Sequence, residues 1–148
     1  SIDRVTFTGV GNTFASGADL REIAAVTAEN AADFARRGQR LMALVAKFPV
    51  ETFAAINGYC FGGALDLALA CNRRIASPDA KFAHPGAGLG IITGWGGTQR
   101  LPRLVGEAAA LELFLTATPI DADKALAIGL VDEISDNPLR SAIESHLS

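Results

Sequence analysis

The sequence predicts an α/β fold, because short apolar runs typical of strands alternate with longer runs typical of helices. Two neighbouring stretches show this most clearly. Residues 53–56 are apolar without polar alternation, as in a strand buried on both faces, and Asn57-Gly58 ends the run. Gly62-Gly63 then opens a second apolar run, residues 64–71, whose Ala and Leu content predicts a buried helix.

The segment before this unit predicts one strand and two helices. Residues 2–8 alternate around Val5 and Phe7, which indicates a strand, and a turn and a loop of small residues follow. Residues 20–48 have helical periodicity, Asn30 divides them into two helices, and Pro49 ends the second. The apolar stripe of this region is predicted to lie in the core: Phe34, Leu41, Met42, Val45 and Phe48.

The segment after the central unit alternates again between strands and helices. We expect strands at 73–76, 81–83 and 130–134, and helices at 103–116, 122–128 and within 136–148. Gly129 is predicted to end its helix as a left-handed residue. Glycines recur through residues 86–98, and a loop of this length in a compact domain usually serves a function.

The composition excludes several classes of protein. The chain has 148 residues, enough for one domain, and a net charge of -3, which argues against a nucleic-acid surface. Its basic pairs, Arg36-Arg37 and Arg73-Arg74, are predicted to lie on solvated faces. No apolar run is long enough to predict a membrane span. Cys60 and Cys71 form neither a disulfide framework nor a zinc motif, so we expect a reducing, cytoplasmic setting.

The turn at Gly62-Gly63 is a candidate anion site. A helix N-terminus presents free backbone N–H groups, and paired glycines let a ligand approach that backbone, although tight helix packing explains the glycines equally well. Asp66 is the one charge in the apolar run. It is either a carboxylate that complements the helix start or an acid–base group whose pKa is raised by burial.

Four motifs resemble those of the crotonase superfamily, the enoyl-CoA hydratase/isomerase family, and they occur in the family's order. They are Phe-Ala-Ser-Gly-Ala-Asp-Leu at 14–20, Asn-Gly-Tyr-Cys-Phe-Gly-Gly-Ala at 57–64, Gly-Trp-Gly-Gly-Thr-Gln-Arg-Leu at 94–101 and Ala-Leu-Ala-Ile-Gly-Leu-Val-Asp at 125–132. The resemblance covers essentially the whole chain. Because the sequence begins with Ser1, we also expect it to be part of a longer gene product.

The resemblance implies a crotonase-like ββα spiral, with residues 1–148 as a single core domain that lacks the family's N-terminal hairpin and most C-terminal helices. It implies an acyl-CoA thioester as substrate, a homotrimer or hexamer, and no metal or redox cofactor, coenzyme A being part of the substrate. The catalytic positions are Ala18 and Gly63, whose backbone N–H groups bind the thioester oxygen, and Asp66 as acid–base. The substrate-binding positions are Ser16, Asp19, Leu20, Gly62 and Gly86.

The chain departs from the family pattern at two positions. Asp66 stands where the family's hydratases carry a Glu, and Gly86 stands where they carry a second Glu. A hydratase uses both carboxylates to hold and activate water, so hydration, isomerisation and other enolate reactions all stay open. His84 is either a compensating catalytic group or a structural residue.

Two other classes remain as alternatives. One is a non-catalytic crotonase-like module that binds acyl-CoA. The other is an α/β-hydrolase of the dienelactone hydrolase type, since residues 58–62 fit a Gly-x-nucleophile-x-Gly elbow with Cys60 as nucleophile. Its acid would be Asp121, Asp123 or Asp132 and its base His146.

Overall fold

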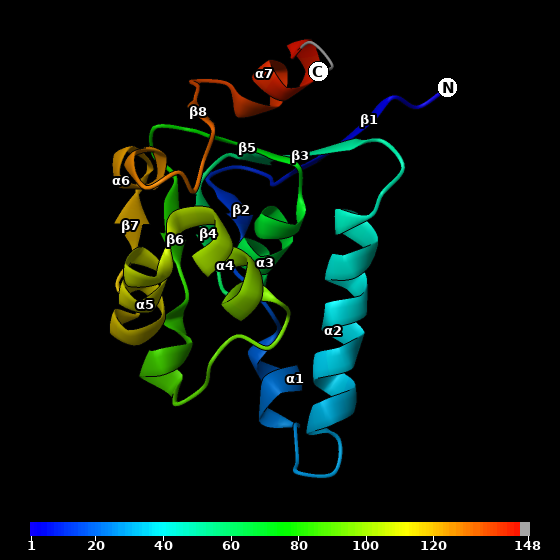
Figure 1. The fold of residues 1–148 in the computed structure, drawn as a ribbon, viewed down its shortest axis with the longest axis vertical. Helices are drawn as coiled ribbons and strands as arrows, with labels where there is room; N and C mark the ends of the chain where they lie inside the picture. The colour runs from blue at the N-terminus through cyan, green and yellow to red at the C-terminus, as the bar shows by residue number, and fades with distance from the viewer. Residues whose placement is uncertain (146–148) are drawn as a thin grey trace.

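The structure is a computed structural model, and it describes residues 1–145. His146 therefore lies outside the described residues. The strands form two four-stranded sheets (Figure 1). The first contains β1 (Arg4–Thr8), β3 (Glu51–Ile56), β5 (Arg73–Ala76) and β8 (Glu133–Ile134), all parallel. The second contains β2 (Thr13–Ala15), β4 (Tyr59–Phe61), β6 (Lys81–Ala83) and an antiparallel β7 (Ile120–Asp121).

The helices follow the strands in a repeating order. Three times in succession, the chain adds one strand to the first sheet, one to the second, and then a helical segment, whereas near its end β7 and α6 precede β8 and α7. This repeat is the predicted ββα spiral. The helices are α1 (Leu20–Ala24), α2 (Ala31–Ala46), α3 (Gly63–Ala70), α4 (Gly97–Val105), α5 (Glu107–Thr116), α6 (Ala122–Ala127) and α7 (Pro138–Glu144), and a 3-10 helix, η1, spans Pro85–Leu89.

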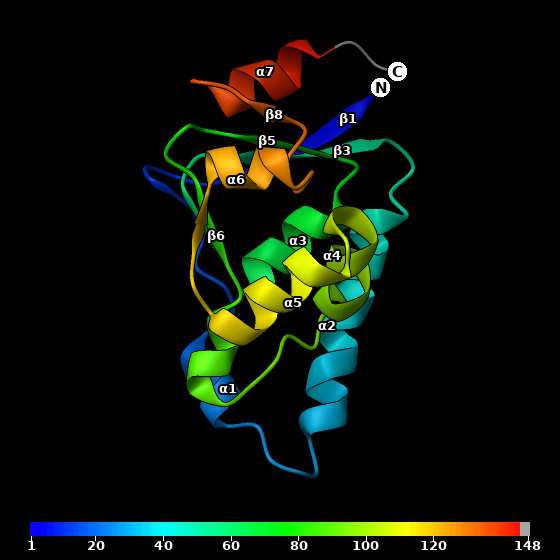
Figure 2. The same ribbon diagram turned by 60° about the vertical axis from the view of Figure 1, so that its left-hand side comes forward.

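The layers place α3 at the centre of the molecule. In Figure 2, α7 covers one face of the first sheet, while α3 and α6 lie on the other. Strand β3 is fully buried from Thr52 onward, which explains its lack of alternation. Helix α3 packs between α2 and α4, so the central strand and helix predicted from the sequence do form the interior.

The sequence prediction missed the first two strands of the second sheet, β2 and β4. β2 and β4 were expected to be loop and turn, but each is a three-residue strand that pairs with the other in parallel. Three residues are too few to show alternation, and their hydrogen-bond partners lie far away in the sequence. The predicted helix at 103–116 is also wrong, because Gly106, at φ +87°, separates α4 from α5.

The predicted apolar stripe of α2 is only partly in the core. Met42 and Val45 are buried, and Phe34 is half-buried with its ring 5.7 Å from that of Trp95. Leu41 and Phe48 were predicted to be core residues, but both side chains are about half exposed. The periodicity of apolar residues predicted the helix correctly, but the buried face that it predicted is wider than the one observed.

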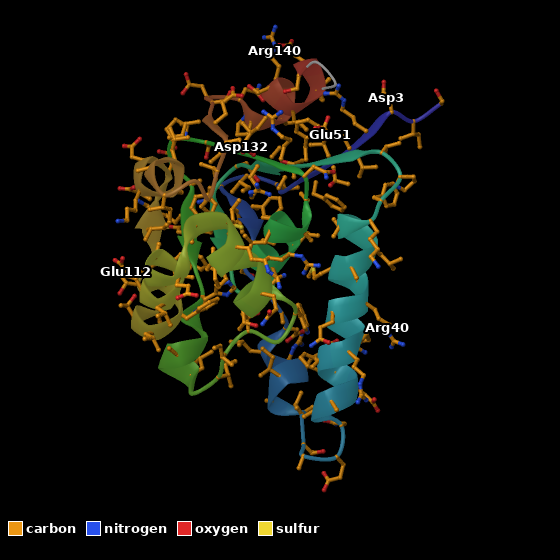
Figure 3. All side chains as sticks on the ribbon, in the orientation of Figure 1. Asp3, Arg40, Glu51, Glu112, Asp132 and Arg140 are labelled. Carbon is orange, nitrogen blue, oxygen red and sulfur yellow. The ribbon has the colours of Figure 1, made fainter. Side chains whose placement is uncertain are left out.

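Arg74 was predicted to lie on a solvated face, and this is wrong. The side chain is 5% exposed, its Nε donates to Leu130 O at 2.8 Å, and its Nη1 donates to Cys71 O at 2.8 Å. Its Nη2 lies 3.7 Å from Asp132 Oδ2, at the junction of β5 and β8, where Figure 3 labels Asp132. Arg74 thus holds the ends of these segments together.

Arg74→Met is expected to lower the free energy of unfolding by about 3 kcal/mol, because two buried carbonyl oxygens lose a charged donor. Arg73→Met is the matched control, since the Arg73 side chain is 37% exposed and its Nε interacts weakly with Asp132 Oδ2, at 3.8 Å. Its effect should stay below about 1 kcal/mol. Urea unfolding of both variants measures the difference, and equal losses would contradict this role for Arg74.

Candidate active site

Two backbone amides from distant segments meet at the N-terminus of α3. Gly62 precedes the helix with φ +60°, and Gly17 stands opposite with φ +107°. A Cβ on Gly17 would lie 2.9 Å from Phe61 O, and a Cβ on Gly63 would lie 3.7 Å from the Ala18 nitrogen. At Gly17 the positive φ and the 2.9 Å separation require glycine, and the 3.7 Å separation at Gly63 shows that the two amides lie close together.

The amides of Ala18 and Gly63 are available to a ligand. Within residues 1–145, neither donates a hydrogen bond to a protein acceptor. Both residues line a cavity of about 440 Å³ whose other walls are largely apolar, including Phe34, Ile92 and Phe114. Two unpaired donors at the start of a helix, facing an apolar cavity, are suited to binding an oxygen that carries negative charge.

Most of the predicted site residues surround this cavity. Its lining includes the following predicted positions: Ser16, Ala18, Leu20, Gly62, Gly63, Asp66 and Gly86. Asp19 is not among the lining residues. It is the N-cap of α1, accepting from Arg21 N at 2.8 Å, and its ion pair with Arg21 lowers the pKa of the carboxyl below its ordinary value. The roles of all these residues remain predictions.

Asp66 lies on the first turn of α3 and is 1% exposed. Burial raises the pKa of its carboxyl from 3.8 to about 6, against opposing effects of the Thr93 hydrogen bond and Arg100. The Thr93 hydroxyl donates to Oδ2, while Oδ1 has no hydrogen-bond partner in the part of the chain described. The carboxylate therefore forms part of the cavity wall and does not cap the N-terminus of α3. Its pKa suits proton transfer near neutral pH.

Two residues that contact Asp66, Thr93 and Gly97, escaped the sequence prediction, as did the packing of Trp95. Thr93 was one unremarkable position in a Gly-rich loop, yet it supplies the hydrogen bond to the carboxylate. Gly97 leaves the space that the carboxylate occupies, because a Cβ there would lie 2.1 Å from Oδ1. Trp95 places its ring against Gly38 and Gly63, at positions where a Cβ would come within 2.1 and 2.5 Å of the indole. No local pattern predicts such contacts between distant elements.

Gly86 has no room for a side chain. A Cβ at this position would lie 2.6 Å from Ile91 O, and Ile91 N donates to Gly86 O at 2.9 Å. The backbone of η1 and the following loop therefore fills the space into which a side chain would extend. A Glu at position 86, the second carboxylate of the hydratase pattern, would therefore clash with this backbone.

Cys60 is not a nucleophile at a strand-to-helix elbow. It lies within β4, is fully buried, and burial raises the pKa of its thiol. Two of the proposed acid partners are also engaged elsewhere, because Asp121 caps α6 and Asp132 pairs with Arg74. The hydrolase alternative is therefore wrong.

Neither a metal cluster nor a membrane-spanning helix is found among residues 1–145. No group of three or more His, Cys, Asp or Glu side chains in this part of the chain is placed to hold a metal ion. No helix there is both long and apolar enough to cross a bilayer.

Comparison with known proteins agrees with the geometry of the site. A family model described as Enoyl-CoA hydratase/isomerase matches residues 1–144. The chain belongs to this family. Among family members, it is 42% identical over 135 residues to a crotonyl-CoA hydratase of Syntrophomonas wolfei subsp. wolfei (strain DSM 2245B / Goettingen), covering 90% of the chain and 52% of that protein.

Solved structures of family members have the same fold. DspI of Pseudomonas aeruginosa superposes with a TM-score of 0.91 at 40% identity, covering 96% of this chain and 55% of that one. An enoyl-CoA hydratase from Bacillus anthracis gives a TM-score of 0.88 at 40% identity, covering 95% and 56%. The chain spans about half the length of the curated relatives it matches.

Proposed function

We propose that the protein is an acyl-CoA enzyme of the enoyl-CoA hydratase/isomerase type, which stabilises a thioester enolate between the amides of Ala18 and Gly63. The observation that carries the proposal is the meeting of these two free N–H groups with a buried carboxylate at one apolar cavity. Each such donor typically contributes about 3 to 4 kcal/mol of transition-state stabilisation. The acyl chain of the substrate fits the apolar wall.

The proposed chemistry is proton transfer at the carbon next to the thioester. When the C–H bond breaks, its electron pair moves onto the thioester oxygen, where the two amides stabilise the charge. Asp66 is an ionisable group of the cavity wall, and the raised pKa of its carboxyl lets it take part in proton exchange near neutral pH. This step is shared by isomerisation, by hydration and by other enolate reactions.

The lack of space at Gly86 supports a reaction that does not need two carboxylates, whereas the names of the relatives support hydration. Incubation with a short 2-enoyl-CoA, followed by mass spectrometry and NMR of the product, separates these reactions. A gain of one water identifies a hydratase, and a shifted double bond identifies an isomerase. An unchanged thioester that nevertheless binds would favour the non-catalytic module, and Asp66→Ala is the control.

Gly86→Glu is expected not to raise the rate of 2-enoyl-CoA hydration and to lower the free energy of unfolding by about 1 to 3 kcal/mol. The reason is that the new side chain must displace the backbone at Ile91. Gly88→Glu is the matched control, because nothing lies within 4 Å of a Cβ at Gly88. A clear gain of hydration in Gly86→Glu would show that the backbone yields to a second carboxylate.

The remaining expectations also stand as proposals. We infer a homotrimer or hexamer, to be tested by light scattering, and no cofactor apart from the coenzyme A of the substrate. Cys60 and Cys71 are buried free thiols, which supports a reducing compartment such as the cytoplasm.

A further inference from the structure

In the site, one polar atom of Asp66 and one of His84 face each other without forming a hydrogen bond. His84 Nε2 and Asp66 Oδ1 lie 3.7 Å apart, and the two side chains are 4% and 0% exposed. Within the described residues, neither atom has a hydrogen-bond partner. A buried polar atom left unpaired costs about 1 to 3 kcal/mol, so two complementary unpaired atoms facing each other point to a working contact. Catalytic hydrogen bonds are often long in a free enzyme and tighten when substrate binds.

His84 lines the same cavity as Asp66. It follows β6 directly, and its ring packs 5.1 Å from that of Phe114 on α5. Because Nε2 faces Asp66, Nδ1 is the ring nitrogen left for a molecule in the cavity. Asp66 also lines the cavity, but its side chain is 0% exposed and its Oδ2 accepts a hydrogen bond from Thr93. Of the two side chains, the imidazole is the one that keeps a small exposed area, 4% against 0%.

We propose that His84 and Asp66 act as one acid–base pair, in which His84 exchanges the proton with the substrate and Asp66 orients the imidazole. This inference rests on the proposed function and deepens it, because it supplies the second acid–base group that Gly86 cannot. Nδ1 of neutral His84 accepts the proton as the α-carbon C–H bond breaks, and the electron pair moves to the thioester oxygen held by Ala18 and Gly63. The imidazolium then returns the proton to carbon.

Burial acts on the pKa values of both groups, and the assignment of the base rests on the facing of Nε2 towards Asp66 rather than on these values. Burial lowers the pKa of His84 to about 4, so the imidazole is neutral near pH 7 and Nδ1 carries a lone pair when the proton is on Nε2. Asp66 faces it from α3 and is ionised above about pH 6, so it stabilises the imidazolium when that forms. Arg100 of α4 acts on Asp66, Cys60 of β4 is uncharged, and Phe114 of α5 carries no charge.

Exchange of the α-protons of butanoyl-CoA for deuterium in D₂O, followed by NMR, tests the pair without assuming the full reaction. His84→Gln keeps an amide near the position of Nε2, so it can contact Asp66, but it has no base at Nδ1. We expect the exchange rate to fall at least about 100-fold, with an unchanged dissociation constant for butanoyl-CoA. A rate within about threefold of wild type would overturn the inference and leave Asp66 as the base.

Three further readouts separate a base from a structural residue. Free imidazole should restore part of the exchange in His84→Ala, and its failure to do so would count against the inference. The double variant His84→Gln/Asp66→Asn should exchange deuterium no more slowly than the slower of the two single variants, because the pair acts as a unit. If the double variant instead loses the product of the two single fold-losses in exchange rate, the two residues act independently. In the wild type, ¹⁵N NMR should show a proton on Nε2 and none on Nδ1, and the opposite tautomer would overturn the assignment. This last measurement needs no variant to fold.

The outcomes also distinguish the inference from the function on which it rests. If the wild type binds butanoyl-CoA and exchanges no deuterium at any pH from 6 to 9, the proposed enolate chemistry fails, and the inference fails with it. If the wild type exchanges and His84→Gln exchanges equally well, only the inference fails.

Discussion

Asp66→Asn is expected to lower the rate of α-deuterium exchange by about 10³ to 10⁴-fold, which is the size of effect known for replacing the carboxylate that orients a catalytic imidazole by an amide. Asn has nearly the same shape and keeps an oxygen for the Thr93 hydroxyl, but it cannot be ionised. It also removes the negative charge that stabilises the His84 imidazolium. Butanoyl-CoA should bind with its wild-type dissociation constant, because the amides of Ala18 and Gly63 are untouched.

Asp66→Glu is the control that keeps the charge, and it should retain more activity than Asn even if the longer side chain fits poorly. Full exchange activity in Asp66→Asn would contradict a catalytic role for this carboxyl.

Asp66→Asn is also expected to be more stable to unfolding than the wild type at high pH. Burial raises the pKa of Asp66 in the folded state from 3.8 to about 6, so the folded protein binds the proton more tightly than the unfolded chain. Ionised Asp66 therefore costs up to about 3 kcal/mol above pH 6, and this cost disappears as the pH falls from 6 towards 3.8. Urea unfolding at pH 8 and pH 4 measures it, and a stability difference that does not change between these pH values would contradict the burial of a charge.

Gly97→Ala should damage both the site and the fold. A Cβ at Gly97 would lie 2.1 Å from Asp66 Oδ1 and 2.9 Å from Thr93 Cγ2, so the carboxylate and its hydrogen-bond donor must both move. We expect the free energy of unfolding to fall by about 1 to 3 kcal/mol, although Ala is the better helix former. We expect exchange to fall about 100-fold or more, because a displacement of about 1 Å at the reacting groups has effects of that size.

Gly88→Ala is the matched control from the same Gly-rich segment. Nothing lies within 4 Å of a Cβ at Gly88, so the free energy of unfolding should change by no more than about 0.5 kcal/mol and exchange should stay at the wild-type rate. Equal damage from both substitutions would mean that the loop tolerates no side chain anywhere, and the specific contact with Asp66 would lose its support.

The sequence was sufficient to predict the central strand, the buried helix and the glycine turn between them. Each depends on neighbours in the sequence, such as the unbroken apolar run of β3 and the paired glycines before α3. The raised pKa of Asp66 was also predictable, because a single carboxyl within an apolar helix must be desolvated. Strands β2 and β4 of the second sheet were not predictable, since they are short and are defined by pairing across the fold, whereas β6 was predicted at its observed bounds.

The surroundings of Asp66 could not be predicted for the same physical reason. Thr93 and Gly97 meet the carboxylate across separate elements, and neither has a signal in its own segment. His84 did carry a signal as a lone histidine before a proline, but only the fold shows that its Nε2 faces Asp66. The exclusion of a side chain at Gly86 likewise depends on the path of the backbone at Ile91.

The most direct test of the central claim is a crystal structure with a non-reacting saturated acyl-CoA bound. The account predicts that the thioester oxygen lies within about 2.7 to 3.1 Å of the backbone nitrogens of both Ala18 and Gly63, with the α-carbon turned towards His84 and Asp66. A thioester oxygen that contacts neither amide, or an acyl group seated outside the cavity between α3 and η1, would contradict it.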